Sequence, residues 1–419
     1  MADQVRRRLF PLLATVIMTA AGMAGTIWGP RYYGKTAWAL PDDLWGTLTA
    51  AQRILHMQLS GLYTPPTQLV SLPGAAVILV PAVAVADLLG LSLAVPHAHG
   101  AYPSLWWFAG PYEVAVSAVA LFAADALAER LGASRPRRFI LAAASATALW
   151  NVTIRWGHPE DAVAVGLLLY AILALAGSRT SRSAWLAGAA VAVQPLVLLA
   201  FPLLAAVVEP RRLAGYGARA AAPSAVLLAV AAAANWTATV HAVTSQPNYP
   251  AVDHPTPWVY LAPHVAAGQV AAGPGRIIAI VAACGCAVVV AHRRRARRTP
   301  GAWSQRDLQE LLWWTAVTLA LRSAFEPVMV SYYLWPPLAV AVIASATHWW
   351  RLFPTGCVVV VLTFFSQISW RNPWSWWTPM VAGLTLALFL ARVRARDGAG
   401  AAPQVLPEPG EQLAAGGAP

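Results

Sequence analysis

The stretch Arg155-Trp156-Gly157-His158-Pro159-Glu160-Asp161 is followed directly by the apolar run AVAVGLLLYAILALAG, residues 162–177. We predict that the segment 161–177 is a helix that crosses a membrane, because about 20 apolar residues span the hydrocarbon core of a bilayer. Two carboxylates, an imidazole and a guanidinium therefore meet at the mouth of this span. Charges at membrane depth are costly, so they usually face a cavity and mark a functional site.

The composition is that of a membrane protein, with 58% hydrophobic residues, 11% charged residues and a mean hydropathy of +0.56. Because apolar segments fill most of the chain, we expect no separate soluble catalytic domain. The net charge of +12 does not indicate a nucleic-acid partner. The arginines lie in short clusters between apolar segments, as they do in the cytoplasmic loops of membrane proteins.

Apolar segments of span length recur along the chain. We expect an all-α, polytopic fold with about ten clear spans, at 9–28, 104–130, 138–154, 161–177, 221–239, 275–292, 308–323, 330–349, 355–370 and 378–393. Two further apolar segments, 72–95 and 184–208, carry Pro81 and Pro195 near their middles, and proline interrupts a helix.

The arginine clusters decide how these two segments run. If both are single spans and the N-terminus is cytoplasmic, the clusters at 135–138 and 179–182 lie outside the cell, against the positive-inside bias. If each is a hairpin of two short helices, or re-entrant, those clusters lie inside. We prefer the second interpretation. It gives one plasma-membrane domain over 1–396 with cytoplasmic termini, external loops at 29–71 and 240–274, and a disordered cytoplasmic tail at 397–419.

The first external loop contains Asp42 and Asp43. Leu44 to Tyr63 after them predicts an amphipathic helix on the membrane surface, because Leu44, Leu48, Ala51, Leu55 and Leu59 recur at helical spacing. One aspartate can act as a helix cap, which is the simpler interpretation. The other then remains as a general base for an acceptor hydroxyl.

The segment around His158 also has two interpretations. Pro159, Glu160 and Asp161 suit the first turn of a helix and its dipole, which needs no further function. This does not account for Arg155 and His158, and an arginine near the membrane surface can hold a phosphate.

Two later external segments complete the set of candidate residues. Asp253 and His254 lie in a proline-rich loop that can cover a cavity or can be merely solvated. Arg322 and Glu326 can pair with each other at four-residue spacing, or Arg322 can anchor a lipid phosphate. Glu113 and Asp87 are further acids in or beside spans that can line the cavity or a proton path. The three cysteines have no metal-binding spacing.

Several motifs resemble those of a known superfamily. Asp42-Asp43 is followed by Gly61-Leu62-Tyr63 and Pro65-Pro66; Trp185-Leu186-Ala187-Gly188 leads to Gln194-Pro195; and Ser331-Tyr332-Tyr333-Leu334-Trp335-Pro336 comes late in the chain. This order is similar to that of the glycosyltransferase-C superfamily. Within it, the chain most resembles the actinobacterial membrane mannosyltransferases that use polyprenyl-phosphate sugars. It departs from them at Gln194, where lysine is frequent, and at Tyr332 or Tyr333, where histidine is common.

The resemblance implies an enzyme that moves a sugar, of mannose type, from a polyprenyl-phosphate donor to an envelope glycolipid or glycan on the external face. It implies that Asp42 or Asp43 is the catalytic base and that Arg322 or Arg155 holds the donor phosphate. The remaining candidates, expected to bind substrate, are His158, Glu160, Asp161, Asp253, His254, Glu326, Tyr332 and Tyr333. The sequence points to no cofactor and leaves open whether a divalent metal takes part.

Two other functions remain open at this stage. A multi-pass transporter or lipid flippase would also use broken helices, although no repeated halves can be aligned. A non-catalytic membrane scaffold would not need clustered external acids.

Overall fold

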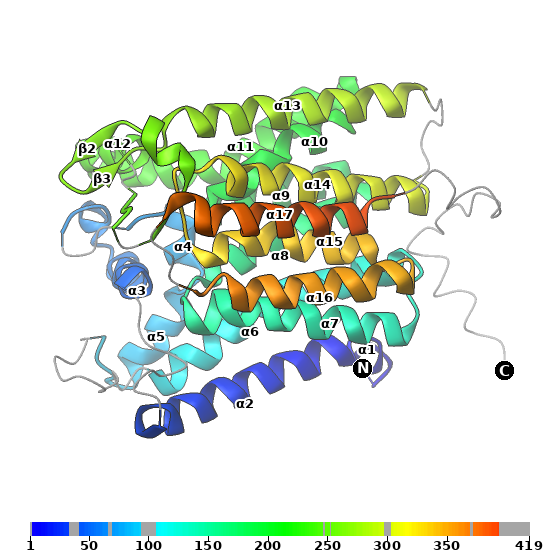
Figure 1. Ribbon diagram of the computed structural model, residues 1–419. Helices are drawn as coiled ribbons and strands as arrows, with labels where there is room; N and C mark the ends of the chain where they lie inside the picture. Colours follow the sequence, from blue (N-terminus) through cyan, green and yellow to red (C-terminus); the bar gives the residue numbers. More distant parts are fainter. Residues whose placement is uncertain are drawn as a thin grey trace.

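The computed structural model describes residues 2–32, 42–65, 69–93, 106–245, 248–251, 253–296, 303–368 and 372–393, and it is almost entirely α-helical. The long helices lie side by side with roughly parallel axes (Figure 1). The helices are α1 (Ala2–Arg7), α2 (Leu9–Tyr32), α3 (Asp42–Leu55), α4 (Pro73–Val77), α5 (Val80–Leu88), α6 (Trp106–Arg130), α7 (Arg135–Trp150), α8 (Pro159–Ala176), α9 (Thr180–Val193), α10 (Phe201–Ala206), α11 (Pro210–Ala234), α12 (Trp236–Thr244), α13 (Gly273–Ala296), α14 (Gln305–Phe325), α15 (Trp335–Ser345), α16 (Trp349–Phe365) and α17 (Pro373–Ala391).

Short elements connect these helices. They are the π-helix η2 (Asn151–Arg155), the 3₁₀-helices η1 (Leu59–Gly61), η3 (Pro195–Ala200), η4 (Pro257–Leu261) and η5 (Ser331–Leu334), and the strands β1 (His254–Pro255), β2 (His264–Ala266), β3 (Gln269–Val270) and β4 (Val328–Met329). The strands form two antiparallel pairs, β1 with β4 and β2 with β3.

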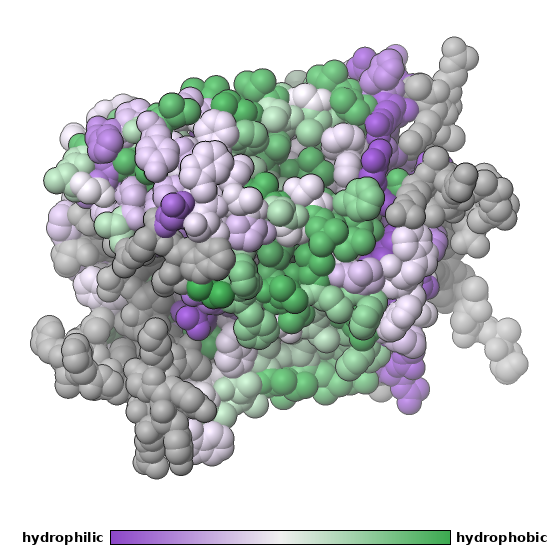
Figure 2. All heavy atoms as spheres, viewed as in Figure 1, coloured by the Kyte–Doolittle hydropathy of each residue, from purple (hydrophilic) through white to green (hydrophobic). Residues whose placement is uncertain are grey.

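Six helices in the described part of the chain are long and apolar enough to cross a membrane: Leu9–Trp28, Trp107–Arg130, Pro159–Ala176, Pro210–Ala234, Gly273–Arg295 and Pro373–Ala391. Figure 2 shows an apolar band across the middle of the bundle, with more hydrophilic residues at both ends. Exposed aromatic residues flank this band, including Trp349 and Phe353 on one side and Trp236 and Trp374 on the other. Such aromatic belts are typical of the two membrane interfaces.

The expectation of about ten single spans is wrong. Four of the segments, 138–154, 308–323, 330–349 and 355–370, do not form helices that are both long and apolar enough. α15 has 11 residues, α7 has 16 and α16 has 17. α14 has 21 residues but carries Arg306, Asp307, Glu310 and Arg322. These helices still fit into the bundle, and all residues of α15 are buried, because neighbouring helices rather than lipid surround it.

The two ends of the bundle differ in chemistry. We call the end with Arg8, Arg138, Arg182, Arg293 and Arg351 the arginine end. The opposite end, which we call the loop end, carries α3, α12 and residues 253–270 (Figure 1). The most hydrophilic surface in Figure 2 lies at the arginine end.

Both proline-containing segments are broken, as expected. α9 ends at Val193, and the next residue, Gln194, hydrogen-bonds Asp161 at the beginning of α8, whereas Val207 after α10 lies beside Arg293 and Asp307 at the arginine end. The chain therefore reverses between α9 and α10. In the other segment both α4 and α5 pack against α3, so this segment starts and ends at the loop end.

The amphipathic helix of the first external loop is shorter than expected. α3 ends at Leu55 rather than near Tyr63, because Met57 has a positive φ of 57° that ends helical geometry. Its apolar face is buried as the spacing predicts, with Leu44 and Leu48 each 1% exposed. α3 lies across the loop end, transverse to the long helices (Figure 1). Helix α3 begins at Asp42, but the side chains of Asp42 and Asp43 lie outside the described part.

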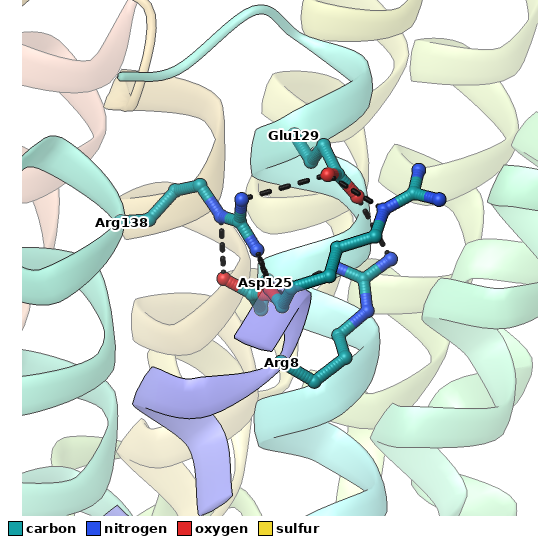
Figure 3. Close-up of polar contacts among 5 residues, drawn as sticks. Arg8, Asp125, Glu129 and Arg138 are labelled. Carbon is teal, nitrogen blue, oxygen red and sulfur yellow. Dashed lines mark hydrogen bonds and ion pairs between the residues drawn. The ribbon is translucent and has the colours of Figure 1, made fainter. Parts of the chain in front are cut away.

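An ion-pair network fixes the N-terminal segment to α6 and α7 at the arginine end (Figure 3). Asp125, 2% exposed, accepts hydrogen bonds from Arg8 at 2.6 Å and from Arg138 Nε at 2.7 Å. Glu129, one turn further along α6, pairs with Arg7 at 2.8 Å and with Arg8 at 2.9 Å. Asp125 and Glu129 thus hold three arginines from two separate parts of the chain.

We expect Asp125→Asn to destabilise the protein by about 3 kcal/mol, because removing one partner of a buried ion pair leaves the other charge uncompensated. Thermal unfolding in detergent measures this. Glu209→Gln is the matched control, because the Glu209–Arg212 pair is exposed and such pairs contribute about 0–1 kcal/mol. Equal shifts for the two variants would contradict a structural role for the network.

Helices α6 and α8 approach each other closely at Gly166. A Cβ on Gly166 would lie 2.7 Å from Cγ1 of Val119 and 2.8 Å from the backbone nitrogen of Ala120. The absence of a side chain at this position lets the two backbones pack together, and this fixes the spacing of the residues that both helices carry to the loop end.

We expect Gly166→Ala to lower stability by about 1–3 kcal/mol through overpacking. Gly285→Ala in α13 should be neutral or slightly stabilising, because a Cβ there has no neighbour within 4 Å and alanine favours helix. Unfolding of both variants under identical detergent conditions tests the contrast, and an unchanged Gly166→Ala variant would disprove the close approach.

Candidate functional site

A tight reversal of the chain presents His158, Glu160 and Asp161 to the interior of the loop end. η2 ends at Arg155, and Gly157 adopts a positive φ of 64°, which glycine tolerates without steric cost. The His158 amide donates to the Val152 carbonyl at 3.0 Å, and α8 begins at Pro159 as the sequence predicts. π-helical turns are frequent at functional sites.

His158 and Glu160 form a buried pair. Nδ1 of His158 lies 2.7 Å from Oε1 of Glu160, and the two residues are 5% and 4% exposed. The imidazole stacks on the ring of Tyr332 with 4.1 Å between centroids. Oε2 of Glu160 has no hydrogen-bond partner among the described residues. The pair therefore offers the second carboxylate oxygen of Glu160 to a further group in the site.

Asp161 is completely buried and joins three elements. Its Oδ1 accepts a hydrogen bond of 2.7 Å from Nε2 of Gln194, the residue that follows α9. Oε1 of Gln194 in turn accepts from the Ser71 hydroxyl at 3.3 Å, just before α4. Both broken segments thus meet at this carboxylate. Oδ2 of Asp161 has no partner in the described part of the chain.

Arg322 brings a positive charge to the same place from the end of α14. Its guanidinium lies 4.2 Å from the centroid of the Tyr333 ring, a cation–π contact. It attracts Asp161 and Glu326 electrostatically. Burial raises the pKa of the Tyr333 phenol, so Tyr333 is neutral at physiological pH. Across the described residues, the side chain of Arg322 makes no hydrogen bond, which leaves its N–H groups available to an anion.

Glu326 does not form a hydrogen-bonded pair with Arg322, so the simple four-residue pairing is not found. Glu326 instead pairs with Arg276 of α13. The reason is local, because α14 ends at Phe325 and Glu326 has an extended backbone with φ −72° and ψ 139°. Arg276 thus compensates Glu326, and Arg322 remains oriented toward the site.

The loop with Asp253 and His254 is fixed against the site. His254 and Pro255 pair with Met329 and Val328, and the Thr256 hydroxyl donates to the carbonyl of Glu326 at 2.6 Å. The His254 ring stacks on Trp376 at 4.4 Å between centroids. Asp253 interacts electrostatically with Tyr333. The part of the loop from His254 to Thr256 therefore packs against the end of α14 and the segment that follows it.

Glu113 is an acid of the site from a different helix, α6. It is 1% exposed, and neither carboxylate oxygen has a hydrogen-bond partner among the described residues. It interacts electrostatically with Glu160 and His158. Its position in an apolar span was the signal that pointed to a cavity or a proton path.

The structure thus brings together most of the candidate residues, in one cluster that we call the loop-end cluster: Glu113, His158, Glu160, Asp161, Gln194, Asp253, Arg322, Tyr332 and Tyr333. Two neighbours border it, Glu326 and His254. Arg155 is not part of it, because its side chain is exposed and contacts no described residue through a hydrogen bond or ion pair. Asp87 also lies apart, since it pairs at 2.8 Å with His56, the residue that follows α3.

Gln194 and Arg276 were missed as candidates. Gln194 carried a signal, because a polar residue beside a proline interrupts an apolar segment there. Arg276 carried none, because only the packing of α13 against the end of α14 reveals its partner. In the described ranges, no three His, Cys, Asp or Glu side chains are arranged to hold a metal ion.

These features define the class of the chain as a helical membrane protein with a buried polar cluster at one end. No family model matches the chain, and a comparison with curated proteins finds no significant relative.

The contact between Gln194 and Asp161 can be tested by a double-mutant cycle. We expect Gln194→Leu alone to destabilise the protein by about 1–3 kcal/mol, because it leaves a buried acceptor unsatisfied. The double variant Gln194→Leu, Asp161→Leu should recover much of this loss, because an apolar pair replaces a polar pair. Additive losses in detergent unfolding would show that the two side chains do not interact.

Proposed function

We propose that this protein is a membrane glycosyltransferase that moves a sugar from a polyprenyl-phosphate donor to an envelope glycolipid or glycan. The observation that carries the proposal is that the guanidinium of Arg322 has no hydrogen-bond partner among the described residues. This guanidinium is half-buried and is held over the Tyr333 ring. A guanidinium suits a phosphate, to which it can donate two parallel hydrogen bonds.

In this proposal Arg322 binds the donor phosphate and stabilises it as the leaving group. The acceptor oxygen attacks the anomeric carbon of the sugar, and the bond from that carbon to the phosphate oxygen breaks. The bonding electrons stay with the phosphate, where the positive charge of Arg322 stabilises the developing negative charge. Tyr333 keeps the guanidinium oriented through the cation–π contact.

A carboxylate takes the proton of the acceptor hydroxyl as a general base. We assign this role to Asp42 or Asp43, at the beginning of α3, because α3 lies across the same end of the bundle (Figure 1). Within the loop-end cluster, Glu160 and Asp161 each retain an oxygen without a described partner, and these oxygens are suited to accept hydrogen bonds from sugar hydroxyls.

The active face is external in this proposal. The arginines gather at the opposite end of the bundle, and basic residues favour the cytoplasmic side. The loop end then faces outward, both chain termini are cytoplasmic, and an acceptor in the envelope has direct access to the site.

A transporter is the second candidate, and Glu113 is the observation that favours it. Unpaired acids within spans often serve proton or ion pathways. The broken segments that meet at Asp161 also resemble the interrupted helices of transporters. The location of the cluster at one end of the bundle, rather than at its middle, favours the enzyme.

The two arginines proposed for the phosphate give a matched comparison. We expect Arg322→Gln to lower sugar transfer from a labelled polyprenyl-phosphate sugar by about 100- to 1,000-fold, the effect of losing one electrostatic group that stabilises a transition state. Arg155→Gln makes the same chemical change at an exposed position and should retain activity. Asp42→Asn and Asp43→Asn, measured in parallel, identify the base.

Membranes that overproduce each variant supply the enzyme for this assay. Equal activity of Arg322→Gln and wild type would contradict the assigned phosphate site while leaving the transferase in place. Absence of transfer by wild type with every polyprenyl donor would favour the transporter.

A further inference from the structure

An apolar groove runs along the outside of α6 and α8. Its volume is about 510 Å³, and its lining includes Ile78, Val116, Val119, Phe122, Val163 and Tyr170. This volume lies in the range of about 300–1,000 Å³ that is common for ligand sites. All of these side chains except Val163 remain partly exposed, so the groove opens at the side of the bundle.

One end of the groove reaches the ion network of Figure 3. Phe122 lies one turn before Asp125 on α6, and Tyr170 interacts electrostatically with Arg8, Asp125 and Arg182. The groove therefore changes from apolar to cationic toward the arginine end. Tyr170, with an apolar ring and a polar hydroxyl, lies at the junction.

The charges at this junction do not balance. Arg7, Arg8 and Arg138 face only Asp125 and Glu129 in the network, which leaves one positive charge in excess. Arg182 adds a second excess charge. It is exposed and makes no hydrogen bond or ion pair with any described residue. An anion beside Tyr170 would compensate this surplus.

We propose that the groove binds an anionic glycerophospholipid of the surrounding bilayer. One acyl chain lies along α6 and α8, and the headgroup phosphate lies at Tyr170 and Arg182. The apolar lining, the lateral opening and the cationic end match the three parts of such a lipid. The proposed headgroup position at Tyr170 and Arg182 lies toward the arginine end, away from the loop-end cluster, and the proposal does not depend on the proposed sugar transfer.

Native mass spectrometry of the full-length protein tests the proposal, with phosphatidylglycerol and phosphatidylcholine as probes. Wild type should retain phosphatidylglycerol in preference to phosphatidylcholine. Arg182→Gln should weaken phosphatidylglycerol binding about fivefold, which corresponds to about 1 kcal/mol per basic residue at an anionic lipid. Arg392→Gln is the control, because it removes the same charge after α17, which packs mainly against α14, α15 and α16.

A second variant tests the groove itself. Ala115 lines the groove and is exposed, so Ala115→Trp should block it without disturbing the core and should reduce the binding of both lipids. Equal retention of the two lipids by wild type would overturn the anionic headgroup site. Equal effects of Arg182→Gln and Arg392→Gln would overturn the assignment of the headgroup to this end of the groove, and unchanged binding by Ala115→Trp would overturn the groove as the acyl site.

Discussion

The cost of placing charge inside an apolar bundle governs the architecture of this protein. A carboxylate or guanidinium removed from water must find compensation within the protein, since isolated buried charges are too costly. In the ion network at the arginine end, both carboxylates are paired, because Asp125 and Glu129 are held among three arginines. At the loop end the compensation is incomplete, because Glu113, Glu160 and Asp161 all keep oxygens without a described partner. The first arrangement is structural, and the second has the properties of a binding site.

Much of the fold could be predicted from hydropathy and arginine placement. The start of α8 at Pro159 and the breaks near Pro81 and Pro195 follow from local rules about helix ends and proline. The number of spans could not be predicted in the same way. An apolar run such as 330–349 does not reveal that η5 occupies its beginning and that a turn after Ser345 ends the helix. Hydropathy shows which residues avoid water, but not whether lipid or other helices surround them.

The site could be predicted only in part, because charged residues in apolar segments cost free energy to bury and therefore indicate a functional site. His158, Glu160, Asp161 and Arg322 stood out because they interrupt or flank apolar segments. Their relations could not be predicted, because the partners come from distant segments. Gln194 meets Asp161 only because α9 ends beside the beginning of α8, and Arg276 meets Glu326 only because α13 packs on α14. The four-residue spacing of Arg322 and Glu326 suggested a local pair, and the extended backbone at Glu326 prevented it.

Arg322 is the proposed anion-binding group of the loop-end cluster, and an electron cryo-microscopy structure tests this assignment most directly. The full-length protein would be reconstituted in lipid nanodiscs with a polyprenyl phosphate. We predict density for the phosphate at about 3 Å from the guanidinium of Arg322, the distance of a charged hydrogen bond. Density for the polyprenyl phosphate beside Arg155, with the surroundings of Arg322 unchanged, would contradict this assignment.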